Sequence, residues 1–147
     1  MENKTFKKVF VEGPIPAEFI AESIAKHQSK TTIGAHNIFL GQVRADVVNG
    51  KKMSAIVYTA HEEMANRVFH EIREATFSKY PLTCMHIYHS LGTVPSGSLC
   101  LFVFVSSERR KVTFQALNFV VEEIKAKVPI FGKELFEDNS HQWKVNT

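Results

Sequence analysis

The run Leu-Cys-Leu-Phe-Val-Phe-Val at residues 99–105 contains no polar side chain. A short apolar run rich in Val and Phe is typical of a strand that is buried on both faces. The polar run Ser-Ser-Glu-Arg-Arg-Lys at residues 106–111 follows it directly. We therefore expect a central strand over residues 99–105, and the rest of the chain to be arranged around it.

A strongly amphipathic helix is predicted after this charged run. Thr113 is a suitable N-cap residue. Pro129 ends the helix, because it has no N–H group and disfavours helical geometry in the residue before it. Apolar residues recur between these two positions at spacings of three and four, which marks one helix face; they are Phe114, Leu117, Val120, Val121, Ile124 and Val128.

The end of this helix and the residues after it read Lys-Ala-Lys-Val-Pro-Ile-Phe-Gly-Lys-Glu, residues 125–134. We expect a break at Pro129, two apolar residues, and then a corner at Gly-Lys-Glu, residues 132–134. Lys125 lies eleven positions after Phe114, so it points within ~20° of Phe114, at the margin of the apolar face. Partial burial there would lower the pKa of Lys125 toward values useful for acid–base chemistry. The alternative is a lysine that extends into water and favours the helix C-terminus.

The remaining elements alternate between strands and helices. Asn49-Gly50 predicts a tight β-hairpin turn, and residues 92–98 read as a turn region. The tail from residue 135 to 147 could add an edge strand or lie across a partner. We expect strands at residues 6–12, 35–44, 54–60 and 83–89, and helices at about 16–27 and 61–80. This order predicts a single α+β domain over residues 1–147, with mostly antiparallel strands.

Composition excludes several classes of function. The net charge is only +3 and no long basic run occurs, which argues against a nucleic-acid-binding protein. No apolar segment is long enough for a membrane span, and the N-terminus lacks a signal-peptide core, so we expect a cytoplasmic protein. Cys84 and Cys100 read as buried thiols in a reducing compartment. His86 and His89 would face opposite sides of a strand, so we expect neither a metal site nor a cofactor.

Two groups of cations are candidates for binding an anion. Arg44 ends a predicted strand beside a loop, where a guanidinium group can bind a phosphate or carboxylate. Arg109, Arg110 and Lys111 lie just before the predicted helix N-terminus, whose free N–H groups also favour anions. In both places the alternative is a charge that simply faces solvent.

The residues in order resemble those of one protein family, the large, catalytic subunit of molybdopterin synthase. Each motif is weak alone, but together they follow the family's order and spacing over almost the whole chain. They are Gly34-Ala35, the run from Phe39 to Arg44, Tyr58 with Met64-Ala65, the run from Ile87 to Gly92, Val105-Ser106-Ser107 with Arg109-Arg110, Phe114 with Ala116, Lys125 with Pro129-Ile130-Phe131, and Lys133-Glu134.

The resemblance implies an α+β fold with an α/β hammerhead and an antiparallel sheet. It also implies a sulfurtransferase that installs two sulfurs on cyclic pyranopterin monophosphate to make the dithiolene of molybdopterin. In the family, sulfur arrives as a thiocarboxylate on the Gly-Gly C-terminus of a small ubiquitin-like subunit. Two large subunits form a homodimer, and each carries one small subunit, which gives a heterotetramer.

The resemblance also assigns site residues. It implies catalytic roles for Lys125, Lys133 and Glu134, with Lys125 as the proton donor and acceptor or as the group that stabilises an acyl-linked intermediate. Arg44, Arg109 and Arg110 would hold the phosphate. The full set of substrate-binding residues implied by the family is Phe39, Gln42, Val43, Arg44, Arg109, Arg110 and Gly132.

Three positions depart from the family pattern. The family usually has His-Arg at Arg109-Arg110, and Trp-Lys-Lys/Arg-Glu at residues 131–134, so Gly132 replaces a lysine here. An arginine that the family often supplies after the tryptophan has no match, and Lys144 is the nearby cation. Three readings therefore stand: an active synthase subunit, a paralogue that binds a ubiquitin-like tail or an anion without catalysis, and an unrelated α+β domain.

Overall fold

The central strand and its neighbours form one sheet flanked by three helices in the computed structural model, which describes residues 7–145. The elements are β1 (Phe10–Glu12), α1 (Ala17–His27), β2 (Ala35–Gln42), β3 (Val47–Val48), β4 (Lys51–Ala60), α2 (Glu62–Lys79), β5 (Cys84–Pro95), β6 (Leu99–Ser107), α3 (Arg110–Lys127), β7 (Ile130–Phe136) and β8 (His141–Trp143). This is a single α+β domain, as predicted.

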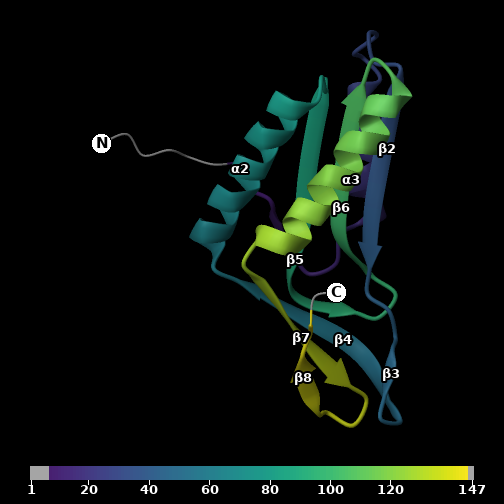
Figure 1. The fold of residues 1–147 in the computed structure, drawn as a ribbon. Helices are drawn as coiled ribbons and strands as arrows, with labels where there is room; N and C mark the ends of the chain where they lie inside the picture. The colour runs from purple at the N-terminus through teal and green to yellow at the C-terminus, as the bar shows by residue number, and fades with distance from the viewer. Residues whose placement is uncertain (1–6, 146–147) are drawn as a thin grey trace.

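The sheet has the order β2-β6-β5-β4-β7-β8, with β1 beside β5 and β3 beside β4. Among the described strands, only the β1–β5 pair is parallel. Figure 1 shows β2, β6 and β5 standing behind α2 and α3, while β4, β7 and β8 continue the sheet below them. The sheet is therefore mostly antiparallel, as the residue pattern predicts.

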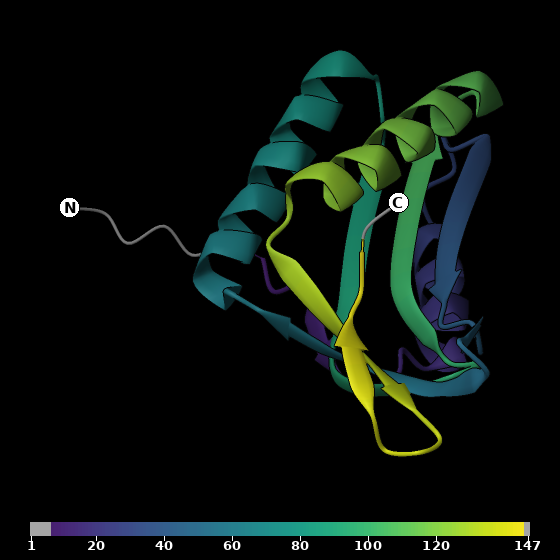
Figure 2. The ribbon, with the colours of Figure 1, turned by 60° about the horizontal axis from the view of Figure 1, so that its bottom comes forward.

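Both faces of β6 are buried, which confirms the prediction for residues 99–105. Phe102 and Phe104 are fully buried in a cluster with Ile15 and apolar residues of α1. The alternate residues of β6 pack in the main core with α2 and α3; they are Leu101, Val103 and Val105. The sheet thus lies between α1 on one face and α2 and α3 on the other, an arrangement that Figure 2 shows from a second side.

The hairpin turn at Asn49-Gly50 is also confirmed. Both residues have positive φ angles, 52° and 77°, as a turn between two twisted antiparallel strands requires. The returning strand β4 begins at Lys51, three residues before its predicted start, because Val47 and Val48 extend the pairing back to the turn.

Several predicted boundaries were wrong. β2 ends at Gln42 and not at Arg44, after a register shift at Gly41. β5 continues through most of the predicted turn region to Pro95, because Gly92, with a φ of 81°, lets the strand leave β6 and pair with β4. β1 begins at Phe10, and the predicted start of this strand at residue 6 lies outside the described residues.

The long amphipathic helix begins earlier than predicted. Its N-cap is Arg109, and Thr113 lies in the first turn, where its hydroxyl donates to the Arg110 carbonyl at 2.7 Å. Phe114, which the periodicity places on the buried face, is 59% exposed. Leu117, Val120 and Ile124 are buried as predicted, whereas Thr113 and Ala116 are buried in place of Phe114 and Val121.

The stretch after α3 was predicted to be a break followed by a corner, and that prediction was wrong. Pro129 does end the helix, but Ile130–Phe136 form strand β7. This strand pairs with β4 on one side and with β8 on the other. The tail therefore adds an edge strand, β8, which is one of the two predicted alternatives. The last two residues of the tail lie outside the described residues. Between residues 7 and 145, no helix is both long and apolar enough to cross a membrane.

Candidate active site

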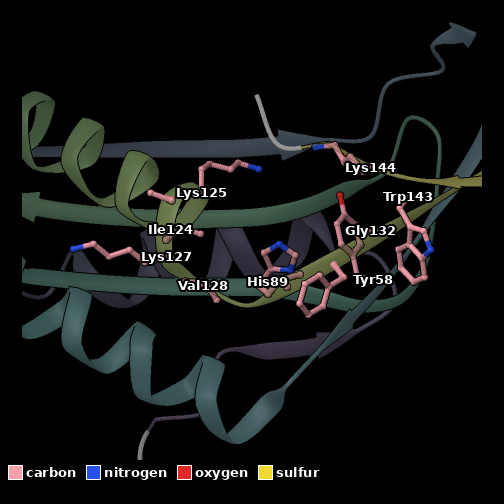
Figure 3. A pocket seen from close by; sticks show the side chains of 12 residues that line it. Tyr58, His89, Ile124, Lys125, Lys127, Val128, Gly132, Trp143 and Lys144 are labelled. Carbon is pink, nitrogen blue, oxygen red and sulfur yellow. The ribbon is translucent and has the colours of Figure 1, made fainter.

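A pocket of about 330 Å³ opens where α3 ends and the strands β4, β5, β7 and β8 come together. Figure 3 shows its lining side chains. They come from α3, β4, β5, β7 and β8, from the segment that joins α3 to β7, and from the residue that follows β8. The lining residues are Tyr58, His89, Ile124, Lys125, Ala126, Lys127, Val128, Ile130, Phe131, Gly132, Trp143 and Lys144. Pro129 makes this arrangement possible, because it turns the chain from the helix into the pocket wall.

Lys125 projects from the last turn of α3 toward this pocket (Figure 3). The residue keeps contact with solvent, but the pocket walls remove part of the water around its ammonium group. This burial lowers the pKa of Lys125 below its ordinary value of 10.5, and the positive charge of Lys144 lowers it further, while Cys100 opposes the shift. A lysine whose pKa is lowered gives up its proton more readily than an ordinary lysine, which suits a role in acid–base chemistry.

His89 lies in the pocket beneath Lys125 and is only 5% exposed. Burial lowers its pKa to about 4, and the charges of Lys125 and Lys144 add to the shift, whereas a hydrogen bond to Ser90 opposes it. The ring is therefore neutral at pH 7. Its Nδ1 lies 2.7 Å from the Ser90 carbonyl, which can only accept, so Nδ1 carries the proton and Nε2 is left as an acceptor.

Tyr58 lies beside His89 in the pocket wall, with its ring 5.1 Å from that of His89 in an edge-on contact. Burial raises its pKa well above the ordinary value, and the neighbouring Cys100 and Glu134 raise it further. The phenol therefore keeps its proton at any pH at which the protein works. The pocket thus combines one tunable ammonium group with a neutral imidazole and a neutral phenol.

Of the three predicted site residues on strand β7, only Gly132 lines the pocket. It lies opposite Tyr58 on β4. Lys133 is half-buried but does not line the pocket, because adjacent residues of a strand project to opposite faces. Glu134 returns to the face of Gly132, and its Oε1 accepts a hydrogen bond from Gln142 Nε2 of β8 at 3.0 Å.

The predicted substrate-binding residues of β2 and of the segment that follows it lie elsewhere. Gln42, Val43 and Arg44 line a second recess of about 600 Å³ that does not include Lys125. Arg44 is exposed, and its Nη2 lies 3.4 Å from Asp46 Oδ2. Val43 is only 2% exposed, so its side chain belongs to the core. Phe39 is half-buried on β2 and packs against the same core.

Arg109 and Arg110 begin α3, whereas Lys125 is in its last turn. Fifteen residues of helix separate Arg110 from Lys125, which corresponds to about 22 Å along the helix axis. Both arginines are exposed at that far end. A single chain therefore groups the predicted residues in three places: the Lys125 pocket, the recess after β2, and the N-terminus of α3.

The residue pattern gave little reason to select His89, Tyr58 and Trp143 as neighbours of Lys125. His89 was considered only as a metal ligand and as part of a family motif, and Tyr58 only as part of another motif. Their proximity depends on the bend of β5 at Gly92, which the prediction missed. Lys144 was noted only as a nearby cation. His86, in contrast, lies on the other side of β5, where its Nε2 is 2.9 Å from His27 Nε2, so the prediction that the two histidines face opposite sides is confirmed.

Comparison with known proteins places this chain in a family. The model of the MoaE protein family matches residues 15–127. The molybdopterin synthase catalytic subunit of Pyrococcus abyssi is 33% identical over 124 residues, covering 84% of this chain and 82% of the relative. The chain spans only about a third, 33%, of the length of the fruit-fly molybdopterin synthase catalytic subunits that it matches.

Solved structures agree in fold. The crystal structure of molybdopterin synthase from Staphylococcus aureus superimposes with a TM-score of 0.79 at 28% identity, covering 98% of this chain and 99% of the other. A complex of subunits 1 and 2 of molybdopterin-converting factor from Helicobacter pylori has a chain with the same fold, with a TM-score of 0.77 at 18% identity over 92% of this chain and 88% of that chain. The extent of the family match and the identity to the Pyrococcus subunit show that the chain belongs to the MoaE protein family.

Proposed function

We propose that this chain is the catalytic subunit of a molybdopterin synthase. In this reaction the sulfur of a protein thiocarboxylate forms a C–S bond to a side-chain carbon of cyclic pyranopterin monophosphate. A C–O bond at that carbon breaks, and its oxygen leaves either with the opened cyclic phosphate or as water. Water then cleaves the acyl–sulfur bond, which releases the carrier's C-terminus as a carboxylate and leaves the sulfur on the pterin. Two rounds give the dithiolene of molybdopterin.

The observation that carries the proposal is the position of Lys125. It combines a lowered pKa, a pocket of its own and a neutral imidazole beneath it. We assign to Lys125 the transfer of protons during sulfur attack, or the stabilisation of the acyl-linked intermediate. No cysteine is among the lining residues of the pocket, which fits a reaction in which the nucleophilic sulfur is brought by a partner.

The partner in this proposal is a small ubiquitin-like protein whose C-terminal Gly-Gly carries the thiocarboxylate. Support comes from the Helicobacter pylori structure, which is a complex of subunits 1 and 2 of molybdopterin-converting factor. An extended Gly-Gly tail has no side chains, so it can enter a narrow pocket such as the one at Lys125. Cys84 and Cys100 are both free and buried thiols, which is consistent with action in the reducing cytoplasm.

The phosphate-binding roles proposed for Arg44, Arg109 and Arg110 require a second copy of the chain. In one copy these arginines and Lys125 lie too far apart to hold one small substrate. A homodimer that brings the arginines of one copy to the Lys125 pocket of the other would complete the site, and with two small subunits it would form a heterotetramer. Glu134 would act through the β8 strand to which it is hydrogen-bonded, and Lys133 would act from the opposite face of β7.

A single-turnover assay tests the proposal. The chain is mixed with the thiocarboxylated small protein and cyclic pyranopterin monophosphate, and molybdopterin is detected. Product from the wild-type chain and none from Lys125→Ala, with the small protein still bound, is the expected result. Binding of the small protein without product from the wild-type chain would contradict the proposal and favour a paralogue that binds without catalysis, which the glycine at position 132 would then explain.

A further inference from the structure

Lys144 is a second lysine in the Lys125 pocket, and it comes from a different part of the chain. It follows β8, and its backbone N–H donates to the Gly132 carbonyl at 2.8 Å. This bond places Lys144 directly opposite Gly132 across the β7–β8 ladder, so its side chain shares the pocket face of Gly132. Figure 3 shows the ammonium groups of Lys125 and Lys144 directed toward one another from opposite sides of the pocket.

Gly132 provides the room for this side chain. A Cβ atom at position 132 would lie 3.1 Å from Cγ2 of Ile56 and 3.5 Å from both the Cβ of Lys144 and Cε1 of Tyr58. A long side chain at 132 would therefore have to share the space that the stem of Lys144 already occupies. The φ angle of Gly132 is not in the left-handed region, so packing, and not backbone conformation, is the reason for a glycine here.

We propose that Lys144 supplies the second ammonium group of the active pocket, in the place that a side chain at position 132 would otherwise fill. The two lysines together would hold an anionic group between them, either the thiocarboxylate of the carrier tail or the phosphate of the pterin. The identity of this anion rests on the proposed function, but the pairing of the two lysines does not.

Electrostatics independently connects the two groups. The charge of Lys144 contributes to the lowered pKa values of both Lys125 and His89. Two cations that share a pocket repel each other when it is empty, and an anion between them relieves that repulsion. Lys127 also lines the pocket but points away from it in Figure 3, and its Nζ lies 2.8 Å from Glu123 Oε2. Lys127 is therefore a matched control for the loss of one positive charge at the pocket rim.

The test moves the ammonium group from one strand to the other. Lys144→Ala should lower kcat/KM for molybdopterin formation by about ten- to a hundredfold, the range for loss of a hydrogen bond to a charged group. Adding Gly132→Lys to Lys144→Ala should restore most of that loss. Lys127→Ala should stay within about threefold of wild type, because its ammonium group is already paired.

Two further measurements make the result specific. NMR titration of Lys125 should give a higher pKa in Lys144→Ala than in wild type, and a value near wild type again in the double variant. A loss confined to the KM for the pterin would assign the anion as its phosphate, and a loss of affinity for the carrier would assign it as the thiocarboxylate. Gly132→Ala in the wild-type background measures the cost of the Cβ atom alone.

The proposal is overturned if Lys144→Ala leaves kcat/KM or the Lys125 titration unchanged, or if Gly132→Lys fails to restore activity in a double variant that melts at the wild-type temperature. Failure of the proposed function would look different. The wild-type chain would then make no molybdopterin, while the titration of Lys125 would still decide whether the two lysines share the pocket.

Discussion

Lys125 is the residue on which the account of the chemistry depends. Replacing it with alanine removes the proposed acid–base group, so we expect single-turnover rates to fall by about 10²–10⁴-fold. Lys125→Arg is the informative companion, because arginine keeps the charge but does not release a proton at neutral pH. Binding of the carrier tail should survive in Lys125→Arg while turnover is lost. Comparable rates for Lys125→Arg and wild type would show that only the charge matters.

His89 makes stability depend on pH. Its pKa is about 4 in the folded chain against an ordinary 6.5, so between these pH values the unfolded chain binds a proton that the folded chain excludes. Its contribution to stability is complete above pH 6.5 and is lost as the pH falls toward 4, up to about 3 kcal/mol. Urea unfolding at several pH values measures this loss.

His89→Asn is the control for that titration. An asparagine side chain can keep the hydrogen bond to the Ser90 carbonyl but does not titrate in this range. The variant should therefore lose less stability than wild type between pH 6.5 and pH 4. Equal pH dependence in the two proteins would show that His89 is not the group responsible, and would leave His86, whose pKa burial also lowers to about 4, as the main contributor.

At the scale of elements, α3 tests the corrected position of the buried face. Leu117 is buried among core residues, so Leu117→Ala should destabilise the chain by about 2–5 kcal/mol. Phe114 is 59% exposed, so Phe114→Ala should cost less than about 1 kcal/mol. Urea unfolding of both variants at pH 7 measures the difference. A larger loss of stability from Phe114→Ala than from Leu117→Ala would show that Phe114 lies on the buried face, as simple periodicity predicts.

The residue pattern predicted most elements and the central place of β6, because apolar runs and turn residues act locally. It failed where contacts between distant parts of the chain determine the secondary structure. Gly92 bends β5 from one partner strand to another, and the residues after Pro129 become a strand only because β4 and β8 pair with them on both sides. Lys125 was found because a helix margin can be calculated, whereas the proximity of Lys144 depends on a strand pairing that no local pattern predicts.

At the scale of the whole molecule, the separation of the arginines from Lys125 predicts a shared site. Lys125→Ala and Arg110→Ala should each be inactive alone. When the two are unfolded and refolded together, half of the dimers are mixed, and each mixed dimer has one site with both residues intact. Activity should then recover to about a quarter of wild type. No recovery from a mixture that does form mixed dimers would place both residues in one chain's site.

The central claim is that sulfur leaves the carrier protein at the Lys125 pocket. Mass spectrometry of the carrier after a single turnover measures this directly, because transfer converts its C-terminal thiocarboxylate to a carboxylate. We predict conversion that requires both the pterin and the wild-type chain, and none with Lys125→Ala although the carrier still binds. Conversion by Lys125→Ala at the wild-type rate would contradict the account, because the chemistry would then take place without the residue around which the pocket is built.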